Sequence, residues 1–180
     1  MSTETETETE SDWARDSDPI FTFLGLYLAT FQWIENQLDQ IILMAEGFDQ
    51  WSKTQIKLAK MDNRSKVDAM ASAAVDESRF PLIGSIDGWP QRVETVRERL
   101  HEERRRRNRI MHSQYLMEGV EHGFPVIRSI RTRGGNQEPF DQEELSRPRM
   151  DAILTEMAHL GWDVGLITVQ LRQATRPDAA

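Results

Sequence analysis

The side chains best suited to chemistry lie in one cationic stretch, EERRRRNRIMHSQY, which spans residues 102–115. Within it, Arg107 and Asn108 are followed by His112. A histidine can transfer a proton near neutral pH, an arginine can stabilise charge that develops on a phosphate, and a neutral amide can orient either group. RNA cleavage without a metal ion requires these groups, so Arg107, Asn108 and His112 are the candidate catalytic residues.

The spacing of these residues sets a condition on the site. On an ideal helix, side chains five residues apart point in directions about 140° apart. One chain would therefore not easily place both Arg107 and His112 on the same phosphate. Either a kink at the end of the helix or a second copy of the motif across a two-fold axis would bring them together.

An interrupted apolar stripe gives a second signal. Val93, Val96 and Leu100 predict the core-facing side of a long helix, but Arg104 and Arg107 continue the same side. Burying a guanidinium without a partner costs several kcal/mol. This face is therefore expected to meet acidic partners, to line a wet cavity or to bind an anion.

Four residues are candidate substrate contacts: Arg104, Ser113, Tyr115 and Glu35. Each also has a structural interpretation. Ser113 and Tyr115 would begin a strand, Glu35 would be a solvated residue at the edge of an apolar stripe, and Arg104 would pair with an acidic residue across a dimer interface.

The remaining ionisable residues near the motif are interpreted as solvated. Arg105 and Arg106 fit a salt-bridged helix face, although Arg106 offers an alternative spacing to His112. His101 and His122 are expected in solvent and His159 at the surface, and the four histidines show no metal-ligand spacing. Because phosphate-binding loops and other cofactor motifs are also absent from the sequence, neither a metal nor a cofactor is expected.

Composition separates an acidic tail from the rest. The chain of 180 residues has a net charge of −8, of which residues 1–17 contribute −5. This T-E repeat predicts a disordered, solubilising tail, or alternatively a nucleic-acid mimic that shields a basic groove. The sequence has no cysteine, no secretory signal and no membrane-spanning segment, which favours a cytoplasmic protein without a membrane partner.

The elements that would hold the motif are mostly helical. Asp18 and Pro19 predict the start of a first helix that ends near Gly47, followed by helices over 48–61 (anchored by Phe48, Trp51 and Ile56), 65–78 and 90–112. A hairpin or irregular flap is predicted over 113–136, a short helical turn capped by Asp141 with Glu144, and a last helix over 148–173. Gly161 and Gly165 would allow a close neighbour, and residues 174–180 are expected to fray.

The fold class predicted from these elements is all-α, a bundle of four to five helices with a small β-hairpin or flap inserted after the motif helix. The domain boundaries are a disordered tail over 1–17, a helical domain over 18–173 and a frayed C-terminus over 174–180.

Residues 107–112, RNRIMH, resemble the R-N-x-x-x-H form of the R-x(4–6)-H motif of HEPN domains (higher eukaryotes and prokaryotes nucleotide-binding), and residues 31–35, FQWIE, are similar to the first helix of that family. The resemblance implies an antiparallel helical bundle, a homodimer whose motifs meet in a cleft, and metal-independent endoribonuclease activity by 2′-hydroxyl attack. It also implies a toxin or defence effector with RNA as substrate and a cognate antitoxin. Some members of the family have lost catalysis, so a non-catalytic nucleotide- or protein-binding homodimer is the alternative.

Overall fold

The computed structural model describes residues 12–122, 124–130 and 141–175. Five α-helices dominate these residues: α1 (Asp12–Glu46), α2 (Trp51–Leu58), α3 (Asn63–Ala74), α4 (Trp89–Met111) and α5 (Arg147–Ala174). Three short strands complete the fold: β1 (Gln114–Leu116), β2 (Val126–Ile130) and β3 (Asp141–Leu145). The first 11 residues of the predicted tail and residues 176–180 of the predicted frayed end lie outside the described part.

Helix α1 begins earlier than the sequence predicts. The expected N-cap at Asp18 is wrong, because the helix starts at Asp12 and contains Pro19. An aspartate followed by proline often marks a helix start, but a proline within a helix is tolerated at the cost of a backbone hydrogen bond. The last six residues assigned to the tail are therefore helical.

The segment after α1 is less regular than predicted. A 3₁₀ turn, η1 (Phe48–Gln50), leads into the short helix α2. The expected anchors are wrong, since Phe48 is 89% exposed, Ile56 is 61% exposed and Trp51 is also exposed. Thr54 and Leu58 are buried instead. These two residues are four apart and share one face of α2, which turns the aromatic residues outward.

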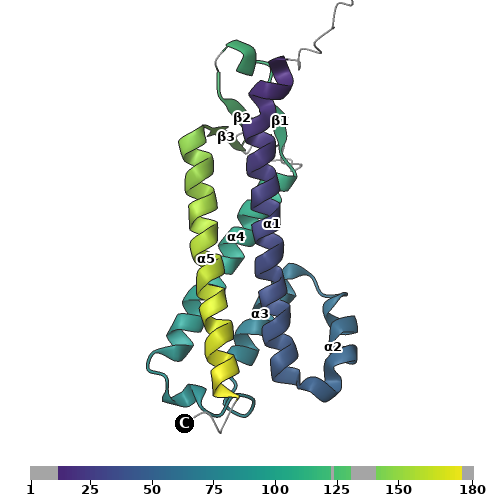
Figure 1. Ribbon diagram of the computed structural model, residues 1–180, viewed down its shortest axis with the longest axis vertical. Helices are drawn as coiled ribbons and strands as arrows, with labels where there is room; N and C mark the ends of the chain where they lie inside the picture. Colours follow the sequence, from purple (N-terminus) through teal and green to yellow (C-terminus); the bar gives the residue numbers. More distant parts are fainter. Residues whose placement is uncertain (1–11, 123, 131–140, 176–180) are drawn as a thin grey trace, which may run out of the picture.

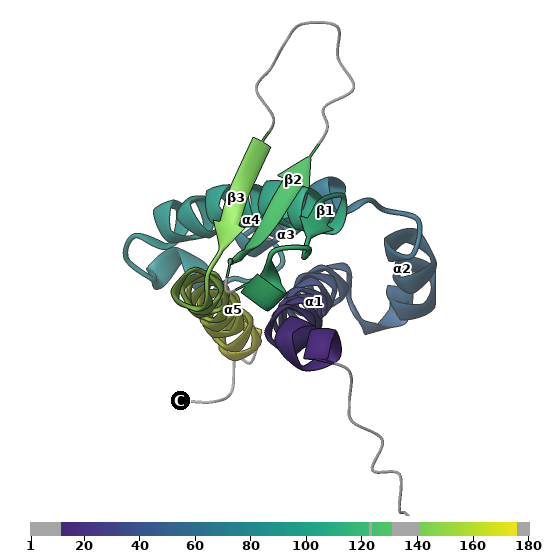
Figure 2. The same ribbon diagram turned by 90° about the horizontal axis from the view of Figure 1, so that it is seen from above.

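A three-stranded antiparallel sheet in the order β1–β2–β3 lies near the C-terminal end of α4 (Figure 2). The predicted hairpin corresponds to β1 and β2, and its last residues, 131–136, lie outside the described part. The predicted helical turn at Asp141 and Glu144 is wrong. Both residues lie in β3, where Asp141 is opposite Ile130 and Glu144 is opposite Ile127. Pairing with β2 satisfies the backbone groups of this segment, so tertiary structure overrides the local capping pattern.

Helices α1 and α5 lie side by side and run in the same direction (Figure 1). Gly161 packs against Trp33, and further along both helices Arg172 donates to Gln40 at 2.6 Å. The predicted antiparallel order is therefore wrong for this pair. When successive helices alternate in direction and the fifth returns to lie against the first, those two must be parallel.

Helix α4 is antiparallel to its neighbours α3 and α5. Arg92 donates to Gln170 at 3.0 Å at one end of the contact with α5, and Arg106 donates to Glu156 at 2.7 Å at the other. The indole of Trp89 donates to the carbonyl of Ala74 at 2.8 Å, where the end of α3 meets the start of α4. These contacts fix the direction of the motif helix.

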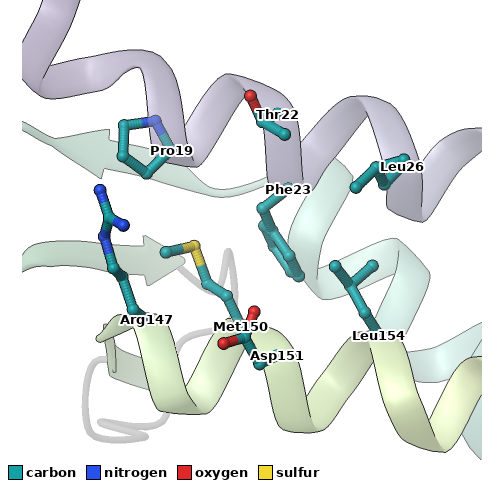
Figure 3. Close-up of a pocket in the computed structure, with 8 residues that line it drawn as sticks. All are labelled: Pro19, Thr22, Phe23, Leu26, Arg147, Met150, Asp151 and Leu154. Carbon is teal, nitrogen blue, oxygen red and sulfur yellow. The ribbon is translucent and has the colours of Figure 1, made fainter.

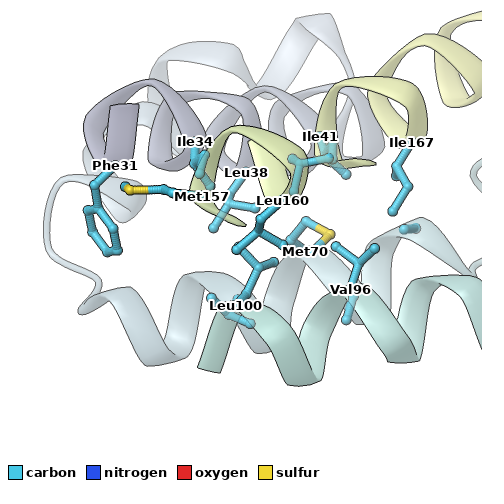
Figure 4. Close-up of a cluster of buried hydrophobic side chains, with 14 of the residues drawn as sticks. Phe31, Ile34, Leu38, Ile41, Met70, Val96, Leu100, Met157, Leu160 and Ile167 are labelled. Atoms are coloured by element: carbon cyan, nitrogen blue, oxygen red, sulfur yellow. The ribbon is translucent and has the colours of Figure 1, made fainter. Parts of the chain in front are cut away.

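The core lies between α1, α3, α4 and α5 (Figure 4). Each helix contributes fully or almost fully buried apolar side chains, among them Leu38, Met70, Leu100 and Leu160. Burying a side chain of this size stabilises the fold by about 1.5–3 kcal/mol. No described helix is both long and apolar enough to cross a membrane.

Candidate functional site

Helix α4 carries the candidate catalytic residues on its last turns. Its N-cap, Gly88, has φ 66°, a left-handed conformation that glycine adopts without steric cost. The helix continues without interruption through Met111, and the amide of His112 donates to the carbonyl of Asn108 at 3.1 Å. The kink considered for the motif is therefore not seen in this helix, and His112 is its C-cap.

Arg107 is half-buried and points towards α1. Its guanidinium lies 5.7 Å from the ring centroid of Phe31, and Nη1 donates to Asn108 Oδ1 at 3.3 Å. The Nε atom is enclosed and has no hydrogen-bond partner among the described residues. Phe31 and Asn108 thus hold a guanidinium whose hydrogen-bonding capacity is not fully used.

His112 is exposed, in contrast to Arg107. Among the described residues no contact joins the two side chains, as expected for directions about 140° apart on a helix. Met111, between them in sequence, is 39% exposed. The structure therefore brings Arg107 and Asn108 together and leaves His112 open to solvent at the end of the same helix.

Ser113 and Tyr115 fasten β1 to the last turn of α4. Ser113 Oγ donates to the carbonyl of Arg109 at 2.5 Å, and the Tyr115 hydroxyl donates to the carbonyl of Ile110 at 2.7 Å. Burial raises the pKa of Tyr115 to about 12. Their hydroxyl groups have structural partners, and their contact with substrate stays a prediction.

Arg128 forms a buried polar cluster behind this junction that sequence reasoning missed. Only 2% of Arg128 is exposed, and it donates to Glu143 at 3.1 Å and to Ser113 at 3.2 Å. Arg149 also donates to Glu143, at 2.7 Å. Burial alone would raise the pKa of Glu143, but its contacts with Arg149 and Arg128 lower it. The cluster joins β2, β3 and α5 to the end of α4.

Glu35 and Arg104 lie near the N-terminus of α3. Glu35 accepts a hydrogen bond from Asn63 Nδ2 at 2.7 Å. The pKa of Asp62, the N-cap of α3, is lowered first by hydrogen bonding from Ser65 and further by the charge of Arg104. The Nε atom of Arg104 is enclosed and, among described residues, has no hydrogen-bond partner. Glu35 thus contacts α3, whereas no described contact links it to Arg107.

Two residues interpreted as solvated have buried or half-buried roles. Arg106 bridges Glu103 at 3.0 Å and Glu156 at 2.7 Å, and Glu103 is buried and accepts from the Tyr27 hydroxyl at 2.5 Å. Burial opposes ionisation of Arg106, but the charges of Glu103 and Glu156 raise its pKa. The predicted salt bridges of Arg106 are therefore confirmed, but its side chain is half-buried rather than solvated and links α4 to α5.

The expectation for His101 is also wrong. Its side chain is 16% exposed, and Nε2 lies 3.0 Å from Asp68 Oδ1 on α3. Asp68 is 33 residues away in sequence, so no local pattern reveals the pair. His122 and His159 have exposed side chains, as predicted.

Two hollows of the surface lie between helices and are lined by described residues. One, of about 560 Å³, lies between α3 and α4 and is lined by Arg64, Asp68, Arg97, His101, Arg104 and Arg105, among others. The other, of about 300 Å³, lies between α1 and α5 and contains mainly apolar side chains, such as Phe23, Leu26, Met150 and Leu154 (Figure 3). Of the candidate site residues, only Arg104 lines either hollow. Within the described residues no three His, Asp or Glu side chains are grouped to hold a metal ion.

Comparison of the chain with models of protein families, with curated proteins and with solved structures found no match.

Proposed function

We propose that this protein is a metal-independent endoribonuclease of the HEPN type, in which α1, α3, α4 and α5 form the bundle and the active site lies where two copies meet. The observation that carries the proposal is the end of α4. There, a guanidinium held against Phe31 and Asn108 is followed by an exposed histidine at the helix C-cap. Arg107, Asn108 and His112 are thus placed by one rigid element.

In the proposed reaction, His112 accepts the proton of an RNA 2′-hydroxyl. The 2′-oxygen attacks the adjacent phosphorus, forming a new P–O bond while the bond to the 5′-oxygen breaks. Arg107 stabilises the charge on the pentacovalent phosphorus centre, and Asn108 orients the guanidinium. The second histidine of the dimer, as imidazolium, protonates the leaving 5′-oxygen. The products carry a 2′,3′-cyclic phosphate and a 5′-hydroxyl.

A second copy is needed because Arg107 and His112 of one chain point in different directions. Exposed apolar side chains near the motif support such an interface. Met111 is 39% exposed, and Leu28, one turn from the Phe31 that holds Arg107, is 37% exposed. The proposal requires a two-fold contact that covers these side chains and brings Arg107 of one protomer near His112 of its partner.

The test is to incubate purified protein with single-stranded RNA in EDTA and to identify the product ends. Wild type is expected to leave 2′,3′-cyclic phosphate ends, and His112→Ala and Arg107→Ala to lose at least about 100-fold in rate. His159→Ala, which removes an exposed histidine from α5, is the matched control and should cleave normally. Unchanged melting temperatures would show that the two inactive variants remain folded. If wild type and both variants are equally inert, the nuclease proposal is wrong.

One observation favours a second candidate function, a non-catalytic nucleotide- or protein-binding homodimer. Arg107 is half-buried over Phe31, a contact that also suits a structural arginine. This candidate predicts that Arg107→Ala lowers the melting temperature or dissociates the dimer, without any RNA cleavage by wild type. A role as a toxin or defence effector with a cognate antitoxin, and a cytoplasmic location, belong to the nuclease proposal.

A further inference from the structure

The groove between α3 and α4 is lined by more positively charged side chains than its ion pairs neutralise. Arg97 contacts Asp68 and Glu94, both at 2.8 Å. Across the part of the chain that the structure describes, Arg64, Arg104 and Arg105 form no ion pair, although all three line the groove. Arg64 and Arg104 act on Asp62 through their charge without a direct ion pair, so all three guanidinium groups can still bind a ligand.

Arg104 forms the inner part of this cationic set. It is half-buried, and its enclosed Nε atom lacks a hydrogen-bond partner among the described residues. Arg104 therefore has hydrogen-bonding capacity that no described residue uses, and its guanidinium lines the groove.

The carboxylates of the groove do not cancel the set. Asp68 is already engaged by Arg97 and His101. Glu98 and Glu102 point about 120° and 160° away from Arg104 on an ideal helix, but only about 20° and 60° away from Arg105. Both are exposed and form no ion pair with Arg105 among the described residues, so solvent screens their charge.

The groove also points towards the motif. Arg104, Asn108 and His112 follow one another at intervals of four residues and so lie along one flank of α4. A rise of 1.5 Å per residue places His112 about 12 Å beyond Arg104 along the helix axis. An extended chain lying on this flank would pass from the arginines to the exposed imidazole.

We infer that the α3–α4 groove binds the phosphate backbone of single-stranded RNA through Arg64, Arg104 and Arg105 and guides the strand along α4 to His112. One guanidinium group can donate two parallel hydrogen bonds to the oxygens of one phosphate. Several such groups therefore suit a backbone that presents successive phosphates. An acidic peptide has a similar charge, but the continuity of the groove with His112 favours RNA. The direction of the strand rests on the proposed nuclease function, whereas the binding site does not.

The experiment measures binding of a fluorescent oligouridylate by anisotropy, with His112→Ala in every protein to keep the RNA intact. The double variant Arg64→Gln/Arg105→Gln changes two exposed side chains in the groove. It is expected to bind about tenfold more weakly and to reduce the slope of log K against log salt by about 1.4. Arg79→Gln/Arg172→Gln removes two exposed charges elsewhere and should stay within about twofold of the parent.

A variant that is expected to strengthen RNA binding complements the arginine variant. Glu98→Gln/Glu102→Gln removes the outer carboxylates and should tighten binding several-fold at low salt. The inference is overturned if the arginine pair behaves like the control pair, or if oligoglutamate binds the groove and oligouridylate does not.

Binding that depends on the groove, together with no cleavage by the protein that retains His112, would overturn the nuclease proposal alone. Cleavage with unchanged binding in the arginine variant would overturn the groove alone.

Discussion

At the scale of single residues, the surroundings of Arg107 must satisfy two requirements. Its position continues the core-facing stripe of α4, so the side chain packs over Phe31, yet its charge requires polar contact. The interrupted stripe predicts acidic partners, a wet cavity or a bound anion for this residue, whereas the structure places it against an aromatic ring. His112 lies where α4 ends and is exposed, which suits a proton-transfer group that must reach substrate.

The two tyrosines of the chain give a prediction at this scale. Burial and the hydrogen bond to Glu103 raise the pKa of Tyr27, and burial raises that of Tyr115 to about 12. In the folded protein, neither should ionise appreciably at pH 11, where a tyrosine of ordinary pKa near 10 would be about nine-tenths ionised. A folded-state pKa above the unfolded value means that stability falls as pH rises through and above 10.

The measurement is an ultraviolet titration of tyrosinate, followed together with circular dichroism. Tyrosinate absorbance should appear only as the protein unfolds. If both tyrosines ionise near pH 10 with the helices intact, the description of their surroundings is wrong.

At the scale of elements, the parallel contact between α1 and α5 depends on Gly161. A Cβ atom there would lie 2.7 Å from Trp33 Cζ3, whereas one at Gly165 would lie 3.8 Å from the same ring. Gly165→Ala should therefore stabilise the protein by up to about 1 kcal/mol through helix propensity. Gly161→Ala should lose that gain and be destabilised by roughly 1–2 kcal/mol, because the ring or the helices must shift.

Chemical denaturation of the two variants checks this prediction, and each serves as the control for the other. Equal stability of Gly161→Ala and Gly165→Ala would contradict the close packing of Trp33.

The junction between the sheet and the helices gives a pH prediction. Arg149 and Arg128 lower the pKa of Glu143 below its ordinary value of 4.5, although burial opposes them. The stability that Glu143 contributes is therefore present above pH 4.5 and is lost as pH falls below it. The difference in unfolding free energy between wild type and Glu143→Gln should shrink in acid.

Glu144→Gln changes the exposed neighbour on β3 and is the matched control. Denaturation at several pH values measures both variants. A difference for Glu143→Gln that stays constant through the acid range would contradict the assigned ion pairs.

For the whole molecule, periodicity was enough to predict the long helices and the location of the motif near the end of α4. Their apolar stripes are local properties of the sequence, so α1, α4 and α5 follow from them with modest errors at the ends. Strand β3 could not be predicted, because its hydrogen-bond partners lie in β2. The parallel direction of α5 relative to α1 could not be predicted either, because it depends on how all five helices pack together. The same limit applies to the site, because the partner of His101 is Asp68 on α3, and Arg128 on β2 donates to Ser113 and to Glu143, each 15 residues away in sequence.

The central claim is that Arg107 and His112 of two copies cleave RNA by 2′-hydroxyl attack without metal. The most direct measurement uses two otherwise identical oligonucleotides in EDTA, one of RNA and one with every 2′-hydroxyl methylated, and follows the appearance of 2′,3′-cyclic phosphate. We expect wild type to cut only the RNA and His112→Ala to cut neither. RNA that stays intact with folded wild-type protein, or that His112→Ala cuts at the wild-type rate, would contradict the proposal.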